Sequence, residues 1–214
     1  MQLILQKLLP VPLREKITAN SSDIWLQNLS FLKGEHISIQ APSGTGKTTL
    51  IHILYGLRTD YEGDVIWDNK TLSAKNGEER SKLRATYVSV VFQDLRLLPQ
   101  LTAWENLELK RSLTNTLAAE NVMDMMEQLG IAEKKNSLCK TLSYGEQQRV
   151  AIIRSLLQPF DWLLMDEPFS HLDHLNIEKA INLIKEIADR NHAGILLADL
   201  EKNDYFHYHK RFFL

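Results

Sequence analysis

One short segment, in which small and hydroxyl-bearing residues run into a lysine, constrains the fold of this chain more than any other feature. It reads Ala41, Pro42, Ser43, Gly44, Thr45, Gly46, Lys47, Thr48 and Thr49. The apolar run at 35–41 before it is typical of a strand, and the run at 47–57 after it is typical of a helix. Small residues let backbone N–H groups converge on phosphate oxygens, and the helix N-terminus behind them favours an anion. The segment therefore predicts a phosphate-binding loop.

Two side chains of this loop are suited to separate tasks at a nucleotide. Lys47 can reach the β- and γ-phosphates, and Thr48 can offer its hydroxyl to Mg²⁺. Such loops usually open with Gly where this chain has Ala41, but Gly44 and Gly46 remain at the tight bend. The alternative is a strand-to-helix turn that binds nothing. The Lys-Thr pair in this context favours phosphate binding.

A second candidate site element is an apolar strand that ends in two carboxylates, Asp166 and Glu167. If the strand belongs to a parallel sheet, its carboxyl end faces the crevice where ligands bind. Asp166 would then hold Mg²⁺, and Glu167 would orient or deprotonate an attacking water. Taken alone, the pair could equally be a polar strand end that turns into solvent at Pro168. The phosphate-binding loop favours the functional interpretation.

The order of the predicted elements indicates an α/β fold. We expect a turn at Lys33-Gly34 and a hairpin around Asp68-Asn69. Between about 95 and 158 the pattern is mainly helical, which predicts a helical insertion into the α/β core. Strands are expected at 24–31, 35–41, 63–67, 71–72, 84–92, 162–165, 195–198 and 211–214, and helices at 47–57, 118–129, 146–157 and 177–188.

Composition excludes several classes of protein. With 214 residues, of which 44% are hydrophobic and 24% charged, the chain is too apolar to be largely disordered. A net charge of −2 argues against a general nucleic-acid coat. Cys139 is the only cysteine, so no intramolecular disulfide can form. No apolar run reaches the roughly 18 residues that span a membrane, and the start lacks a signal-peptide pattern, so a cytosolic protein is expected.

The segment 142–149 reads Leu-Ser-Tyr-Gly-Glu-Gln-Gln-Arg and lies shortly before the acidic strand end. Ser143, followed three residues later by Glu146, predicts a capping box at the start of a helix. The same capped helix N-terminus, with its free N–H groups, is also suited to hold a γ-phosphate. The two interpretations do not exclude each other.

These motifs, in this order and spacing, resemble those of the ATP-binding cassette (ABC) ATPases, and the resemblance covers nearly the whole chain. The segment 142–146 is similar to the family's signature, which reaches across a dimer to the nucleotide of the partner. Gln93 matches the glutamine of the Q-loop, and the residues Ser-His-Leu-Asp at 170–173 match the D-loop. The resemblance implies a P-loop NTPase (RecA-like) core with an antiparallel β subdomain and an inserted α-helical subdomain. It implies a single ABC ATPase domain over 1–214, with the core in 1–94 and 159–214 and the helical subdomain in 95–158.

The resemblance also implies roles for individual residues in the binding of ATP and Mg²⁺. Glu167, Gln93 and Lys47 would be catalytic. Thr48, Gln93 and Asp166 would hold the metal ion. Two ATP molecules would lie between the phosphate-binding loop of one subunit and three positions of the other, namely Ser143, Gly145 and Asp173.

The stretch 91–107 narrows the resemblance to the branch that contains lipoprotein-release, macrolide-efflux and cell-division ATPases. Members of that branch work as dimers beneath permeases with large extracytoplasmic domains. The resemblance implies that the groove around 93–106 receives a cytoplasmic helix of such a permease, and ordinary core packing of its leucines is the alternative. The protein would then be a homodimer without a nucleic-acid partner, peripheral on the cytoplasmic face of the inner membrane.

Three positions depart from the family pattern. Leu200 stands where a histidine that contacts the γ-phosphate is expected, and Tyr144 stands where the signature usually has Gly. The range Pro12–Thr18 offers no aromatic ring to stack on adenine, which leaves Leu13 or Ile17 for that contact. These departures favour ATP binding over fast turnover. They keep two alternatives open: a degenerate ATP-binding regulatory module with little hydrolysis, and a soluble ABC protein outside transport.

Overall fold

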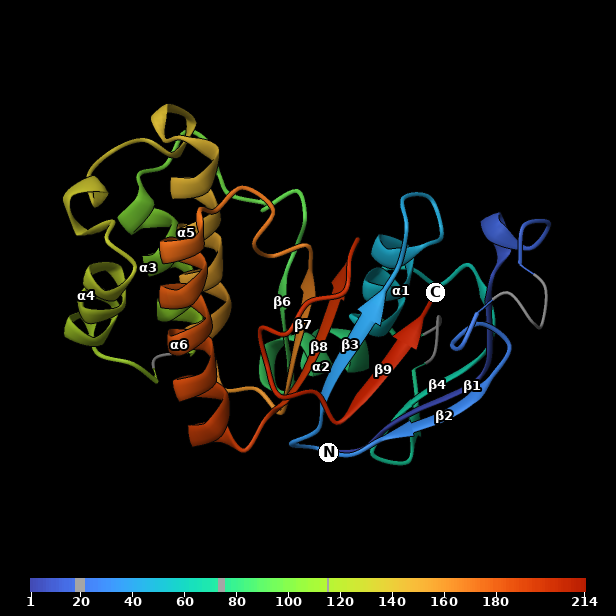
Figure 1. The fold of residues 1–214 in the computed structure, drawn as a ribbon. Helices are drawn as coiled ribbons and strands as arrows, with labels where there is room; N and C mark the ends of the chain where they lie inside the picture. Colours follow the sequence, from blue (N-terminus) through green and yellow to red (C-terminus); the bar gives the residue numbers. More distant parts are fainter. Residues whose placement is uncertain (18–21, 73–75, 115) are drawn as a thin grey trace.

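The computed structural model describes residues 1–17, 22–72, 76–114 and 116–214. At its centre lies a parallel sheet made of β3 (His36–Gln40), β6 (Val88–Val91), β7 (Trp162–Asp166), β8 (Gly194–Asp199) and β9 (Lys210–Phe213). These strands follow the order β6-β7-β8-β3-β9 (Figure 1). The register places Asp166 beside Ala198 and Gln40 beside Asp199. The carboxyl ends of β7, β8 and β3 therefore lie at one edge of the sheet, as the sequence predicts.

A second, antiparallel sheet lies beside the parallel one (Figure 1). It contains β1 (Leu3–Pro10), β2 (Asn28–Phe31), β4 (Tyr61–Trp67) and β5 (Lys70–Thr71) in the order β2-β1-β4-β5. The predicted hairpin turn is confirmed, because Asp68 and Asn69 have φ angles of 50° and 65°, as a type I′ turn requires. The sequence pattern does not predict β1. The strand predicted at 24–31 is shorter, since 24–27 forms a turn before β2.

Helices cover the parallel sheet, and they fall into two groups. The first group is α1 (Lys47–Leu54) and α2 (Gly77–Thr86), and the second is α3 (Ala103–Thr114), α4 (Ala119–Gln128), α5 (Tyr144–Leu156) and α6 (His174–Asn191). The second group gathers on one side of the parallel sheet, while the antiparallel sheet lies on the other side (Figure 1). Short 3₁₀ turns occur at Val11–Leu13, Ala132–Lys134 and Cys139–Thr141.

All four predicted helices are present, the one expected at 47–57 as α1, whereas α2 is not anticipated by the sequence pattern. Those expected at 118–129, 146–157 and 177–188 correspond to α4, α5 and α6. The range 84–86, predicted as the start of a strand, is instead the end of α2. A polar helix with a single buried apolar residue, Leu83, carries too weak a periodic signal to be recognised. The α/β architecture with its helical insertion confirms the predicted fold class.

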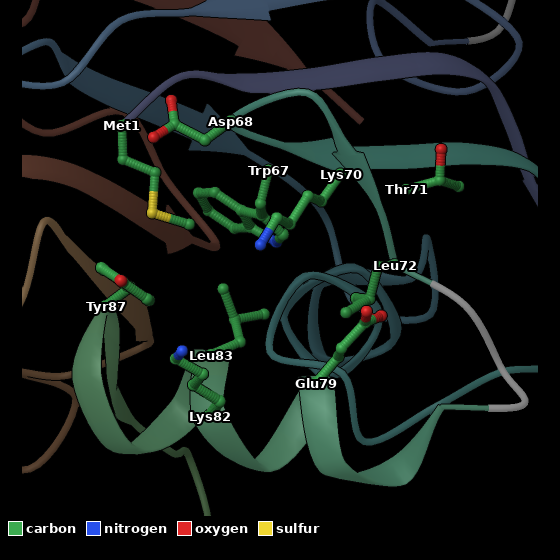
Figure 2. Close-up of a pocket in the computed structure, with 10 residues that line it drawn as sticks. All are labelled: Met1, Trp67, Asp68, Lys70, Thr71, Leu72, Glu79, Lys82, Leu83 and Tyr87. Carbon is green, nitrogen blue, oxygen red and sulfur yellow. The ribbon is translucent and has the colours of Figure 1, made fainter.

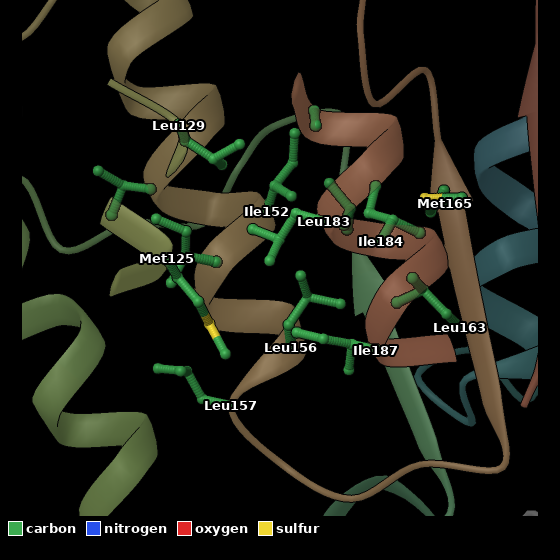
Figure 3. Close-up of a cluster of buried hydrophobic side chains, with 14 of the residues drawn as sticks. Met125, Leu129, Ile152, Leu156, Leu157, Leu163, Met165, Leu183, Ile184 and Ile187 are labelled. Atoms are coloured by element: carbon green, nitrogen blue, oxygen red, sulfur yellow. The ribbon is translucent and has the colours of Figure 1, made fainter. Parts of the chain in front are cut away.

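The two faces of the parallel sheet join two different hydrophobic clusters, because successive side chains of a strand point to opposite faces. On β7, Leu163 and Met165 belong to the cluster shared with α4, α5 and α6. Figure 3 shows this cluster, with Ile152 of α5 and Leu183 of α6 between the helices. The alternate residues Trp162 and Leu164 belong to the cluster shared with α1 and the antiparallel sheet. Burial on both faces fixes the strand, and with it the position of the carboxylates at its end.

Candidate functional site

The phosphate-binding loop connects β3 to α1 and depends on two glycines. Gly46 caps α1 with a φ of 110°, and a Cβ atom there would lie 2.7 Å from the Cδ1 atom of Leu13. Gly44 has a φ of 82° but open space around it, so conformation alone favours glycine at that position. The indole Nε1 of Trp25 donates a hydrogen bond to the carbonyl of Thr45 at 3.3 Å. The loop is thus held in place from outside, and no sequence signal marks Trp25 for this task.

Lys47 folds back over its own loop. Its ammonium donates to the carbonyl of Ala41 at 2.7 Å and to that of Pro42 at 3.5 Å, and it lies 3.3 Å from Oε1 of Glu167. Lys47 and Glu167 are 6% and 8% exposed. A buried ammonium and a buried carboxylate compensate each other's charge. The structure therefore brings together two residues that the sequence separates by more than half of the chain.

Thr48 links the loop to the end of β7 and to the segment after β6. Its hydroxyl donates to Oδ2 of Asp166 at 2.7 Å, and Oε1 of Gln93 lies 3.4 Å from the same hydroxyl oxygen. A hydroxyl has a single proton, so the shorter contact takes it. The three residues predicted to hold a metal ion thus converge on one point from three separate elements.

The carboxylate of Asp166 is buried at this point with an incomplete set of hydrogen bonds. It is 1% exposed, and its Oδ1 atom has no hydrogen-bond partner within the described residues. Burial raises the pKa of Asp166, and the neighbouring Glu167 carboxylate adds to the effect against the opposing hydrogen bond from Thr48. Hydroxyl, carboxylate and amide oxygens are the ligands that Mg²⁺ takes. A divalent cation would use the free oxygen and remove the repulsion between the two carboxylates, so the residues present fit Mg²⁺.

Glu167 is positioned by its backbone. Its φ of 47° is unusual for a non-glycine residue, and its N–H donates to the carbonyl of Ala198 at 2.9 Å. The buried amide of Gln148 donates to the carbonyl of Glu167 at 3.3 Å and accepts from the N–H of His171 at 3.1 Å. Strained backbone of this kind is held by its surroundings and is typical of functional sites. Nothing in the sequence distinguishes Gln148 from Gln147 for this bridging task.

Lys47, Thr48 and Glu167 line one open cavity of about 320 Å³ at the carboxyl edge of the parallel sheet. Leu13, one of two residues expected to contact adenine, also lines it, whereas Ile17 packs against the hydrophobic cluster around α1. Thr18, the last residue of the range in which the family pattern places an adenine-stacking ring, lies outside the described residues. The complete lining is Leu13, Ser43, Gly44, Gly46, Lys47, Thr48, Thr49, Gln93 and Glu167.

The N-terminus of α5 lies outside this cavity. Ser143 is its N-cap, with Oγ accepting from the N–H of Glu146 at 3.3 Å, and Oε2 of Glu146 accepts from the N–H of Ser143 at 2.8 Å. The predicted capping box is confirmed. Gly145 lies so close to the 167–171 segment that a Cβ atom would come 2.8 Å from the carbonyl oxygen of His171. Asp173 caps α6 through the N–H of Asn176 at 2.9 Å, a hydrogen bond that lowers its pKa.

Ser143, Gly145 and Asp173 are therefore not brought to the phosphate-binding loop of their own chain. Leu200 follows β8 and is 42% exposed, and its N–H donates to Oδ1 of Asp199 at 2.7 Å. Burial raises the pKa of Asp199, and the Leu200 hydrogen bond opposes that rise. The side chain of Leu200 supplies no polar atom to the site.

A separate cavity of about 220 Å³ lies between the β4–β5 hairpin and α2, and Figure 2 shows Leu83 and Trp67 at its centre. It shares no residue with the phosphate-binding cavity. Lys70 and Lys82 lie at its rim together with Asp68 and Glu79, so its charges balance. Nothing in its lining points to a particular ligand.

No helix among the described residues is both long enough and apolar enough to cross a bilayer.

Comparison with known proteins gives a consistent result. Residues 26–170 match a protein family described as "ABC transporter". The "Uncharacterized ABC transporter ATP-binding protein YbbA" of Escherichia coli K12 is 38% identical over 168 residues, which cover 77% of this chain and 73% of that protein. The "Lipoprotein-releasing system ATP-binding protein LolD" of Treponema denticola is 32% identical over 179 residues, which cover 82% and 79% of the two chains.

Two solved structures of a cassette named MJ0796 resemble this fold. The structure described as a dimeric bacterial ABC transporter cassette has a TM-score of 0.79 and 28% identity, over 93% of this chain and 88% of that one. The dimeric post-hydrolysis state bound to ADP and Pi has a TM-score of 0.75 and 29% identity over the same shares.

Proposed function

Because the chain belongs to the family of ABC transporter ATP-binding proteins, we propose that it binds ATP with Mg²⁺, closes into a homodimer and hydrolyses the ATP to drive a membrane permease. The observation that carries this proposal is that Lys47, Thr48 and Glu167 line one cavity, while the Thr48 hydroxyl donates to the buried Asp166. A buried Asp166 oxygen that has no partner among the described residues, together with the buried Lys47 ammonium, is a suitable receptor for a metal–phosphate complex.

The proposed nucleotide site has a phosphate end, formed by the phosphate-binding loop, Gln93, Asp166 and Glu167. Each residue there has a distinct proposed task. The ammonium of Lys47 exchanges its contacts with the loop carbonyls and Glu167 for the β- and γ-phosphate oxygens of ATP. Thr48, Asp166 and Gln93 hold Mg²⁺, which when bound supplies positive charge to the phosphate oxygens. Glu167, released from Lys47, orients and deprotonates the attacking water, as its position beside the phosphate-binding loop allows.

Dimer formation is proposed because the polar groups that the reaction uses do not all lie at one site of a single chain. Ser143, Gly145 and Asp173 lie away from the phosphate-binding cavity of their own chain. A capped helix N-terminus on an exposed surface is suited to the γ-phosphate of a second subunit. The dimeric state of the MJ0796 cassette supports this arrangement.

The partner proposed for the dimer is an integral membrane permease with an extracytoplasmic domain, as the resemblance of the stretch 91–107 implies. The relative from Treponema denticola is named as the ATP-binding protein of a lipoprotein-releasing system. The protein would be peripheral at the cytoplasmic face of the inner membrane. The helical range 95–158 is proposed as a separate subdomain, with 1–94 and 159–214 as the core, and the groove around 93–106 as the permease contact.

The test is the variant Glu167→Gln. It keeps the shape of the side chain but removes the base, so ATP binding should persist, the dimer should accumulate, and turnover should fall by about 10²–10⁴-fold. Steady-state phosphate release and light scattering with MgATP measure the two effects. Asp161→Asn, at the amino end of β7, is the matched control and should hydrolyse ATP at the wild-type rate. Wild-type turnover in the Glu167→Gln protein would refute the assignment of the base.

A second candidate function, an ATP-responsive regulatory module with little hydrolysis, is favoured by one observation. Leu200 offers no polar side-chain atom where the family pattern has a histidine. Phosphate release by the wild-type dimer with its permease separates the two functions. Turnover that the permease stimulates supports the first, while ATP-dependent closure without measurable phosphate release supports the second.

A further inference from the structure

The side chain of Tyr144 does not extend from the exposed end of α5 but folds back onto its own chain. Its hydroxyl donates to the backbone carbonyl of Gln93 at 3.1 Å. Its ring lies against the imidazole of His171, with ring centroids 4.1 Å apart and an interplanar angle of 48°. The ring is 43% exposed, so burial alone does not explain this orientation. Two specific contacts hold it.

These contacts join three segments that are far apart in the sequence. Gln93 follows β6, and its side-chain oxygen lies 3.4 Å from the Thr48 hydroxyl at the phosphate end. His171 belongs to the segment after Glu167, and its Nδ1 atom lies 2.9 Å from the Ser170 hydroxyl. Tyr144 is the residue next to the Ser143 cap. A single side chain therefore touches the backbone of a residue at the phosphate site and fixes the first turn of α5.

In addition to the ion pair between Glu146 and Lys134, two anchors join the start of α5 to the 167–171 segment. Gly145 approaches the carbonyl of His171, and the buried amide of Gln148 bridges His171 and Glu167. Both connect α5 to the 167–171 segment only. Among these three anchors, Tyr144 alone also reaches Gln93. The hydrogen bond from the Tyr144 hydroxyl therefore links the Gln93 backbone directly to the first residue of α5.

We propose that Tyr144 is a positioning residue that couples the phosphate site of its own chain to the exposed N-terminus of α5. Nucleotide at the phosphate-binding loop engages the Gln93 side chain, the Gln93 backbone shifts, and the hydrogen bond to Tyr144 carries this shift to Ser143. Occupancy of one site then prepares the surface that meets the second subunit. The inference rests on the proposed function, since it takes both ends to be parts of nucleotide sites.

The experiment is hydrogen–deuterium exchange of the monomeric full chain with and without saturating MgADP. In the wild type, the amides of 41–49 should be protected by the nucleotide, and the exchange of 144–150 should change by about threefold or more, the size that one hydrogen bond supports. Tyr144→Phe keeps the ring on His171 and removes only the hydroxyl. It should retain protection of 41–49 and lose the nucleotide-dependent change at 144–150.

Two further variants separate coupling from packing. His171→Ala removes the ring contact but leaves the hydroxyl bond to Gln93, so part of the nucleotide-dependent change should remain. Tyr87→Phe is the matched control, because Tyr87 is similarly exposed, at 37%, and lies at the opposite end of β6 from Gln93. It should behave as the wild type.

Each remaining outcome is decisive. If Tyr144→Phe alters exchange at 144–150 equally with and without MgADP, the residue only packs, and the proposal is overturned. The same holds if the wild type protects 41–49 with no change at 144–150. If MgADP fails to protect 41–49 in the wild type, the proposed function itself fails, and the inference falls with it.

Discussion

The two ends of the proposed nucleotide site differ in how far one chain satisfies their polar groups. At the phosphate end, Lys47, Asp166 and Glu167 are buried and face one another. At the signature end, Ser143 and Tyr144 are exposed, and the helix terminus is capped by Glu146 of the same helix. The first end holds charges that favour a ligand, whereas the second is an ordinary helix start that is complete without one.

The two ends also differ in how their residues affect the free energy of folding. A buried carboxylate with a raised pKa and a non-glycine residue at positive φ both oppose folding. Both are found at the phosphate end, at Asp166 and Glu167. The signature end instead has a capping box, which stabilises the helix by about 1 kcal/mol. The phosphate end therefore carries two destabilising features that the signature end lacks.

The largest effect is expected for Lys47→Ala. The variant loses charge-assisted hydrogen bonds to phosphate, so the affinity for MgATP should fall by about 10²-fold or more. It also leaves the Glu167 carboxylate buried without its cation. Lys33→Ala is the control, because Lys33 also pairs with a carboxylate, Asp161, but lies away from the phosphate-binding cavity. Fluorescence titration of both variants measures the affinity, and equal losses would contradict the assignment of the site.

Two glycine substitutions should have smaller effects, one on ATP turnover at the signature end and one on nucleotide binding at the phosphate end. Gly145→Ala places a methyl group 2.8 Å from the His171 carbonyl without requiring a positive φ. It should displace the first turn of α5 and reduce ATP turnover by roughly tenfold. Because the cavity does not include Gly145, the affinity of the monomer for nucleotide should be unchanged. Gly44→Ala has space for the methyl group but a φ of 82°, so it should weaken nucleotide binding instead.

Phosphate-release assays measure the turnover of both glycine variants, and nucleotide titrations measure their affinities. A loss of monomer affinity in Gly145→Ala would show that the two ends are not separate.

The smallest effects concern stability, and they have opposite signs at the two ends. Burial raises the pKa of Asp166, so its ionisation opposes folding at a pH above the carboxyl's unfolded pKa. Asp166→Asn should therefore raise the free energy of unfolding of the nucleotide-free protein at pH 7 by about 1 kcal/mol. That gain should vanish in acid, below the unfolded pKa.

Glu146 provides the comparison. The Ser143 backbone N–H lowers its pKa, so its ionised form favours folding above the unfolded pKa, and this contribution is lost as the pH falls through the folded value. Glu146→Gln should lower stability at pH 7 by a few tenths of a kcal/mol, since the group is partly exposed. Urea unfolding at several pH values measures both variants. A loss of stability in Asp166→Asn at neutral pH would contradict the opposite signs expected for the two variants.

Local signals account for much of the agreement between sequence and structure. The hairpin at Asp68-Asn69, the capping box at Ser143 and the strand 162–165 each depend on residues close together in the chain. A turn type, a cap or a period-2 apolar run needs no distant partner, so residue type and spacing specify it. The strand β1 and the helix α2 lack such signals, because their formation depends on pairing and packing with distant segments.

The sequence by itself determined the glycine-containing loop between β3 and α1, the carboxylates that end β7 and the capped start of α5, because short-range chemistry encodes each of them. Only the tertiary structure decided that Lys47 contacts Glu167, that one oxygen of Asp166 has no partner in the described part of the chain, and that Tyr144 bonds to Gln93. Those facts depend on the register of parallel strands and on the packing of α5 against the 167–171 segment. Long-range contacts of this kind are set by burial over the whole core, which no short stretch of residues can specify.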